Sequence, residues 1–306
     1  MTHLQPLIDA HHHFWALDKS VPYPWLEDQP VKGFFLGNYD AIRRPFLPDD
    51  LRTLVPEGYR LTGSVHCEAE ARRDSAVAET EWIDALGKRD GLPRAHVGWA
   101  AFGDPACAEQ LDAQQASPLF RGVRAKPLTA TTPDRVQSVQ GARGSLQDRR
   151  WCEGLSMLSE RGLSWDLRVP AWHLKDAAET LAAYPELRVV LNHAGLPWDR
   201  TPQGIEQWRD GMQALAANPN VAVKLSELGT PFHPRDDAAD LDILCTALEI
   251  FGPQRCLYAS NAPVAGLRLG LDEWLSQVER AIAQSAPGHR QAVLHDNAVH
   301  WYRLAL

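Results

Sequence analysis

The chain has few cysteines, no closely spaced cysteine pair and no long apolar run. Its five cysteines are scattered through 306 residues without a CxxC motif, so the sequence indicates neither a disulfide framework nor a cysteine zinc site. We expect reduced thiols, most of them buried. No apolar run reaches the roughly 18 residues that a membrane-spanning helix needs. The chain is 44% hydrophobic and 23% charged, which excludes an intrinsically disordered protein.

A basic surface and a signal peptide are also missing from the sequence. The formal net charge is −8 and the basic residues are dispersed, so we expect no nucleic-acid partner and no binding to anionic membranes. The segment from Met1 to Pro6 lacks the basic start and apolar core of a signal peptide, which predicts a cytoplasmic protein.

Short β-rich runs alternate with helix-like segments along the whole chain, and this pattern predicts the fold. Strands separated by helices run parallel, and eight such units close into a (β/α)8 TIM barrel. We predict one such domain over residues 1–306. The expected strands are 7–11, 60–69, 95–102, 120–126, 163–169, 187–193, 221–228 and 255–260. The clearest helical segments are 75–89, 151–161, 174–183, 205–217 and 239–251.

The alternative to a barrel is an open doubly wound sheet. That fold carries a glycine-rich phosphate loop after its first strand, whereas this chain has three histidines there. Two long segments, 16–47 and 128–147, follow the first and fourth strands, so we expect them at the carboxyl end of the barrel as substrate loops. The first is rich in aromatic residues and is expected to be a packed lid or a dimer contact.

Histidines lie at the carboxyl ends of two predicted strands. Residues two apart in a strand point the same way, so His11 and His13 share one face with Asp9, and His12 faces the other way. Two converging imidazoles form half of a metal site. His193 follows the sixth strand, where barrel enzymes place catalytic groups. We therefore predict His11, His13 and His193 as metal ligands, with His193 also catalytic.

Other polar side chains share these strand ends. His66 and Glu68 are catalytic candidates, Glu68 as a base or as the group that orients His66, with a structural ion pair as the alternative. Arg124 and Lys126 are suited to a substrate carboxylate or a developing oxyanion. Three further candidates for substrate binding are Asp166, Lys224 and Trp25, each of which could instead be structural.

An ordered set of motifs in this sequence resembles a known family. The motifs include His11-x-His13, Asn192-His193-Ala194-Gly195, Val223-Lys224-Leu225-Ser226 and Ala259-Ser260-Asn261-Ala262-Pro263. Over nearly its whole length the chain is similar to the amidohydrolase-2 branch of the amidohydrolase superfamily. This resemblance implies a distorted TIM barrel and a metal-dependent hydrolase. Relatives in this branch hydrolyse lactones, such as sugar-acid lactones and pyrone dicarboxylates.

One position departs from the family pattern. Relatives commonly carry Asp after the eighth strand as a metal ligand or general base, whereas this chain has Asn261. An amide is no base near pH 7 and a poorer metal ligand than a carboxylate. We therefore expect Asn261 to orient water or substrate. Two alternatives stay open: one bound divalent ion, with zinc the expected metal, or a metal-independent site with its base elsewhere.

The sequence thus predicts a hydrolase that opens a small lactone or related cyclic ester, with a sugar-acid lactone as the expected substrate. One alternative is a decarboxylase or isomerase of a small unsaturated acid on the same scaffold. Another is a binding protein that lost catalysis through the exchange at Asn261. The expected partner is a small-molecule substrate, and a homo-oligomer is compatible with the sequence.

Overall fold

Eight parallel strands form one sheet in the order β1 to β8. The computed structural model describes residues 4–306, so the first three residues of the segment Met1 to Pro6 lie outside the described part of the chain. The strands are β1 (Gln5–His12), β2 (Tyr59–Cys67), β3 (Ala95–Gly98), β4 (Phe120–Val123), β5 (Ser164–Leu167), β6 (Val189–Leu191), β7 (Val221–Leu225) and β8 (Cys256–Tyr258). The predicted barrel is confirmed.

The first and last strands nearly close the barrel. His12 and Ala262 form a parallel bridge, and the Asn261 amide donates to the His11 carbonyl at 2.7 Å. The carboxylate of Asp9 accepts hydrogen bonds from the Ser260 hydroxyl (2.5 Å) and the Ser260 amide (2.9 Å). This junction sets the residues after β1 beside those after β8.

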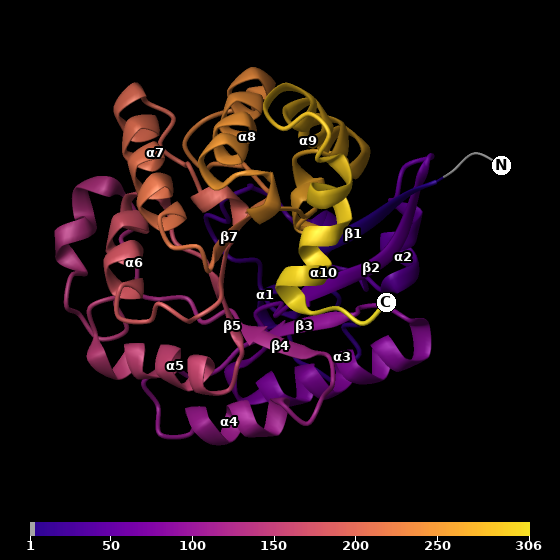
Figure 1. Ribbon diagram of the computed structural model, residues 1–306. Coiled ribbons are helices and arrows are strands. Elements are labelled where there is room, and N and C mark those ends of the chain that lie inside the picture. The colour runs from indigo at the N-terminus through magenta and orange to yellow at the C-terminus, as the bar shows by residue number, and fades with distance from the viewer. Residues whose placement is uncertain (1–3) are drawn as a thin grey trace.

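Helices surround the strands, and the C-terminal helix α10 lies across them in the view of Figure 1. The helices are α1 (Pro24–Glu27), α2 (Pro48–Thr53), α3 (Ala76–Asp90), α4 (Cys107–Gln114), α5 (Arg149–Glu160), α6 (Leu174–Leu181), α7 (Pro202–Ala216), α8 (Asp237–Phe251), α9 (Leu271–Ser285) and α10 (Asn297–Tyr302). The predicted helical segments overlap α3, α5, α6, α7 and α8. Most strands end earlier than predicted, so several candidate site residues lie just beyond the last strand pairing. No helix within residues 4–306 is long and apolar enough to cross a membrane.

Side chains alternate between the two faces of each strand. On β5, Trp165 and Leu167 belong to the main core cluster with the surrounding helices, whereas Asp166 between them does not. The Tyr302 hydroxyl on α10 donates to the Asp166 carboxylate at 2.9 Å. Together with apolar residues of the strands, α10 thus fills the barrel interior beneath the candidate site.

The segment 16–47 packs into a small core of its own. Trp15, Tyr23 and Tyr39 are buried in a cluster with residues that follow β2 and β8. Trp25 stacks on Phe34 with a centroid separation of 6.1 Å. The segment is therefore packed, and its role as a lid or as a dimer contact stays a prediction. Residues 128–147 lie against the loop after β5 instead, where the Ala130 amide donates to the ring of His173 at 2.9 Å.

Glu79 makes the stability of the protein depend on pH. Its buried carboxyl group accepts hydrogen bonds from the Tyr23 hydroxyl (3.2 Å) and the Ala69 amide (2.9 Å). Burial, reinforced by the charge of Glu68, raises the pKa of Glu79 from 4.5 to about 8. The folded protein therefore keeps a proton that the unfolded chain has already released between these two pH values. The contribution of Glu79 to stability is complete below about pH 4.5 and is lost as the pH rises through 8.

The variant Glu79→Gln should remove this dependence, because the amide is neutral at every pH. We expect its free energy of unfolding to exceed that of wild type by on the order of 2–4 kcal/mol at pH 9 and to match it near pH 4. Urea denaturation at both pH values measures the difference. Glu81→Gln, an exposed change on the same helix, serves as the control. An equal effect of Glu79→Gln at both pH values would contradict the prediction.

Candidate functional site

A cavity of about 330 Å³ opens at the carboxyl ends of the strands. Its volume lies at the small end of the range for ligand pockets, roughly 300–1,000 Å³, and indicates a small ligand. Six predicted site residues line it: His13, Trp25, Arg124, Lys126, His193 and Asn261. The lining also includes Val31, Phe34, Phe35, Ala69, Glu70, Arg168, Leu196, Glu227 and Val264. None of these residues comes from the segment 128–147.

Two histidines, His13 and His193, line this cavity, and the buried His11 lies against both. The ring of His11 lies 5.0 Å from that of His13 and 4.7 Å from that of His193, between centroids. Burial, with a contribution from Arg124, lowers the pKa of His13 to about 3, and burial lowers the pKa of His193 well below its usual value. Both rings are therefore neutral near pH 7.

The hydrogen bonds of the two cavity histidines leave one ring nitrogen without a partner on His193 but none on His13. In His13, Nδ1 donates to the Cys67 carbonyl at 2.8 Å, and Nε2 lies 3.1 Å from the side-chain oxygen of Asn261. In His193, Nδ1 is 2.9 Å from the Ser226 hydroxyl. This contact leaves Nε2 of His193 as the ring nitrogen available to a ligand.

Cationic side chains form one wall of the cavity. Arg124 is buried and donates from Nε to Glu68 Oε1 at 2.8 Å. Lys126 forms an ion pair with Glu70, and burial lowers the pKa of Lys126 to about 8. The guanidinium of Arg124 is thus held rigidly, while Lys126 has a weaker hold on its proton than an exposed lysine. Both arrangements suit the binding of a developing negative charge.

His66 and Glu68 lie behind this wall and do not line the cavity. Glu68 is the ion-pair partner of Arg124, and it also lies 3.5 Å from Arg73. His66 is 3.1 Å from His96, ring nitrogen to ring nitrogen, and 3.3 Å from the Phe14 carbonyl. Glu68 therefore matches the structural alternative, the ion pair, and makes no hydrogen bond to His66. A catalytic role for either residue stays a prediction.

Asp166 and Lys224 form a buried ion pair deeper in the barrel. Both side chains have no exposed surface, and Lys224 Nζ lies 2.5 Å from Asp166 Oδ2. Asp166 also accepts hydrogen bonds from Asn192 (3.1 Å) and Tyr302 (2.9 Å). Neither member of the pair lines the cavity, so their predicted contact with substrate stays untested.

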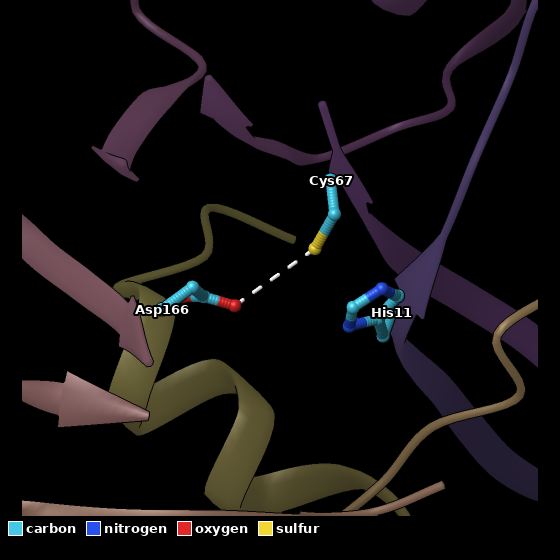
Figure 2. Close-up of side chains that lie close together, drawn as sticks. All are labelled: His11, Cys67 and Asp166. Carbon is cyan, nitrogen blue, oxygen red and sulfur yellow. Dashed lines mark hydrogen bonds between the residues drawn. The ribbon is translucent and has the colours of Figure 1, made fainter. Parts of the chain in front are cut away.

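Three side chains of types that bind metal ions lie close together near this ion pair. His11, Cys67 and Asp166 each bring one ligand atom within 4.8 Å of the others (Figure 2). However, Lys224 Nζ lies 3.2 Å from His11 Nδ1 and 3.4 Å from Cys67 Sγ, in addition to its ion pair with Asp166. The ammonium group thus already makes the contacts that a cation would make. Burial also raises the pKa of the Cys67 thiol to about 12, which disfavours the thiolate that a metal needs.

These residues therefore do not fit a metal ion in their present arrangement. The second ring nitrogen of His11 is 3.3 Å from Arg124, so both of its nitrogens face cationic groups. A metal would have to displace one of these cations before His11 could bind it. Metal binding by His13 and His193 stays a prediction, and the chemistry below includes no metal step.

Three charged residues of the cavity, Glu70, Arg168 and Glu227, were not predicted from the sequence as site residues. Arg168 follows β5 and makes no ion pair with any of residues 4–306. Burial and the charge of Arg124 lower the pKa of Arg168 to about 10. Glu227 follows β7 and is buried, with 3% of its surface exposed. Arg168 and Glu227 lie within the last two residues of the predicted strands 163–169 and 221–228, and Glu70 directly follows the predicted strand 60–69. This position at the carboxyl end of a strand is the signal that could have identified them.

Comparison with known proteins places the chain in a family. Residues 8–304 match the family model described as amidohydrolase. An L-fucono-1,5-lactonase of Burkholderia multivorans is 31% identical over 97% of this chain and 96% of its own length. An L-fucono-1,5-lactonase of Burkholderia ambifaria is 27% identical over 97% and 95%. A crystal structure of a Burkholderia multivorans amidohydrolase with bound zinc is 28% identical, covers 99% of this chain and 100% of its own, and has a TM-score of 0.77. The chain belongs to the amidohydrolase family.

Proposed function

We propose that this protein hydrolyses a small lactone or related cyclic ester, with a sugar-acid lactone as the preferred substrate. The observation that carries the proposal is the composition of the cavity. It combines cationic side chains, neutral histidines and one buried carboxyl group within about 330 Å³ at the mouth of the barrel. Water addition to an ester carbon requires such groups: donors for the oxyanion, and an acceptor for the proton of water.

The lining suggests how a lactone would lie. Trp25 and Phe34 offer apolar faces on which the carbon skeleton of a sugar ring can pack. Arg124 and Lys126 provide donors for the carbonyl oxygen as it becomes negative. The Nε2 atom of His193 faces the same space and can exchange a hydrogen bond with the reacting ester. Arg168 remains free to bind a further oxygen of the substrate.

Similarity to two proteins named L-fucono-1,5-lactonase supports this choice of substrate class. The zinc-bound relative supports zinc as a cofactor to test, because the chain has buried histidine, cysteine and aspartate side chains close together. The position of Lys224 favours catalysis without that metal.

A screen of lactones tests the proposed function. Purified protein is assayed with a pH indicator against L-fucono-1,5-lactone, other sugar-acid lactones and a carboxylate-bearing pyrone, with and without chelator. We expect acid release from at least one sugar-acid lactone, undiminished by chelator. Carbon dioxide release without hydrolysis would instead indicate a decarboxylase. Tight binding of a lactone without turnover would indicate an inactive homologue, and either result would contradict the proposal.

A further inference from the structure

We propose that Glu227 is the general base of this site and replaces the aspartate that relatives commonly carry at position 261. The inference rests on the proposed lactone hydrolysis and assigns one of its steps to a residue after β7. Asn261, after β8, lines the same cavity but cannot accept a proton near pH 7. Two carboxyl groups line the cavity: Glu70 forms ion pairs with Arg73 and Lys126, whereas Glu227 forms none with residues 4–306 and is placed to act as the base.

The surroundings of Glu227 leave one of its oxygens free for a ligand. Oε1 accepts a hydrogen bond from the Gly229 amide at 2.5 Å. Oε2 is buried and forms no hydrogen bond of normal geometry with residues 4–306, although the Asn261 side chain lies near enough to the carboxyl group to lower its pKa. A buried polar atom without a partner costs on the order of 1–3 kcal/mol, so such an atom calls for a specific explanation. Glu227 lines the cavity, so a small shift of its side chain would bring Oε2 into contact with a water molecule or substrate there, which would supply the missing partner.

The backbone at this point also favours a functional explanation. Glu227 has φ of 23°, on the left-handed side that residues other than glycine, asparagine and aspartate rarely adopt. Residues held in such conformations cost about 1–3 kcal/mol and cluster at active sites. The carboxyl group of Glu227 is thus held at the cavity by a backbone conformation that is unfavourable by itself.

Burial of Glu227 brings its proton affinity toward the working range of a base. Burial raises the pKa of Glu227, and the Asp240 carboxylate on α8 raises it further. The Gly229 amide, Arg268 and the Asn261 side chain oppose that rise in pKa. A carboxylate with a raised pKa is a stronger base than an exposed one and remains ionised on the alkaline side of that pKa.

The proposed step moves one proton through Glu227 and replaces the ring carbon–oxygen bond by a bond to the water oxygen. The Glu227 carboxylate takes one proton from water while the water oxygen forms a bond to the lactone carbonyl carbon. The resulting tetrahedral oxyanion collapses, the ring carbon–oxygen bond breaks, and the proton on Glu227 passes to the departing ring oxygen. The product is an open-chain hydroxy acid, which ionises and releases one proton to the solvent. Asn261 acts as a positioning residue, since its side-chain amide group lies within hydrogen-bond distance of His13 Nε2 and can donate to that nitrogen.

The variant Glu227→Gly tests the proposal with little risk to folding. Glycine adopts a positive φ readily, so the substitution removes the carboxylate and relieves the backbone strain together. We expect kcat to fall by roughly 100-fold or more, the usual contribution of a general base, with a smaller change in KM. Wild-type kcat/KM should rise with pH through the raised pKa of Glu227, and this acid limb should disappear in the variant.

Formate added to Glu227→Gly provides the decisive readout, because it can enter the vacated space and act as an external carboxylate. We expect a concentration-dependent recovery of kcat. Glu57→Gln is the control, since Glu57 is exposed before β2, at the opposite end of the barrel. A variant with wild-type kcat and an intact acid limb would overturn the inference, as would an inactive variant that formate does not rescue. Wild-type protein inactive on every lactone would instead refute the proposed function.

Discussion

Replacing Lys224 by alanine should lower the free energy of unfolding by about 3–5 kcal/mol, because it leaves Asp166 as a buried charge without its partner. Lys224 and Asp166 are both completely buried, and their charged atoms are 2.5 Å apart. Urea denaturation of the two proteins at neutral pH measures the loss. The control is Lys175→Ala, which breaks an exposed pair with Asp210 and should cost at most about 1 kcal/mol.

The same variant should bind zinc at His11, Cys67 and Asp166, where the Lys224 ammonium group makes the contacts of a cation in the wild-type protein. Without the ammonium group, His11, Cys67 and Asp166 present three ligand atoms within 4.8 Å of one another, and these are ligand types that zinc accepts. We expect zinc to raise the melting temperature of Lys224→Ala but not that of wild type. The gain should increase with pH, because zinc must displace the proton of the Cys67 thiol, whose pKa is raised to about 12. One tightly bound zinc per wild-type chain at these residues would contradict this prediction.

Replacing His193 by asparagine should lower kcat/KM for the lactone by roughly 100-fold or more. The imidazole lines the cavity, and the Ser226 hydroxyl at 2.9 Å from Nδ1 leaves Nε2 for the substrate. Asparagine tolerates the positive φ of 55° at this position, so the fold should be preserved. Steady-state kinetics with matched circular dichroism spectra check the result.

Two further variants test the role of His193 more closely. His233→Asn changes an exposed histidine and should leave kcat/KM unchanged. Ser226→Ala removes only the group that orients the ring, so its loss should be smaller than that of His193→Asn and should fall mainly on kcat. Full activity of a folded His193→Asn protein would exclude the imidazole from the reaction.

The sequence by itself determined the barrel and the part of the site that follows directly from strand periodicity. Alternation along β1 places His11 and His13 on the same side, and their ring centroids are 5.0 Å apart. Parallel strands bring their carboxyl ends to one face, so Arg124, His193 and Asn261 meet although they are far apart in the chain. Side-chain alternation and the common direction of parallel strands both follow from the order of residues and elements, which can be read directly from the sequence.

Only the tertiary structure decided what each of these groups contacts. The ion pair of Lys224 with Asp166 joins β7 to β5 across the barrel interior, and its place beside Cys67 depends on how those strands align. Strand register and closure arise from packing of the whole barrel, as the register shift between Asp9 and His12 illustrates. Glu227 was missed for the same reason. It lies beyond the last residue of β7, and a backbone with φ of 23° rather than strand periodicity brings its carboxylate to the cavity.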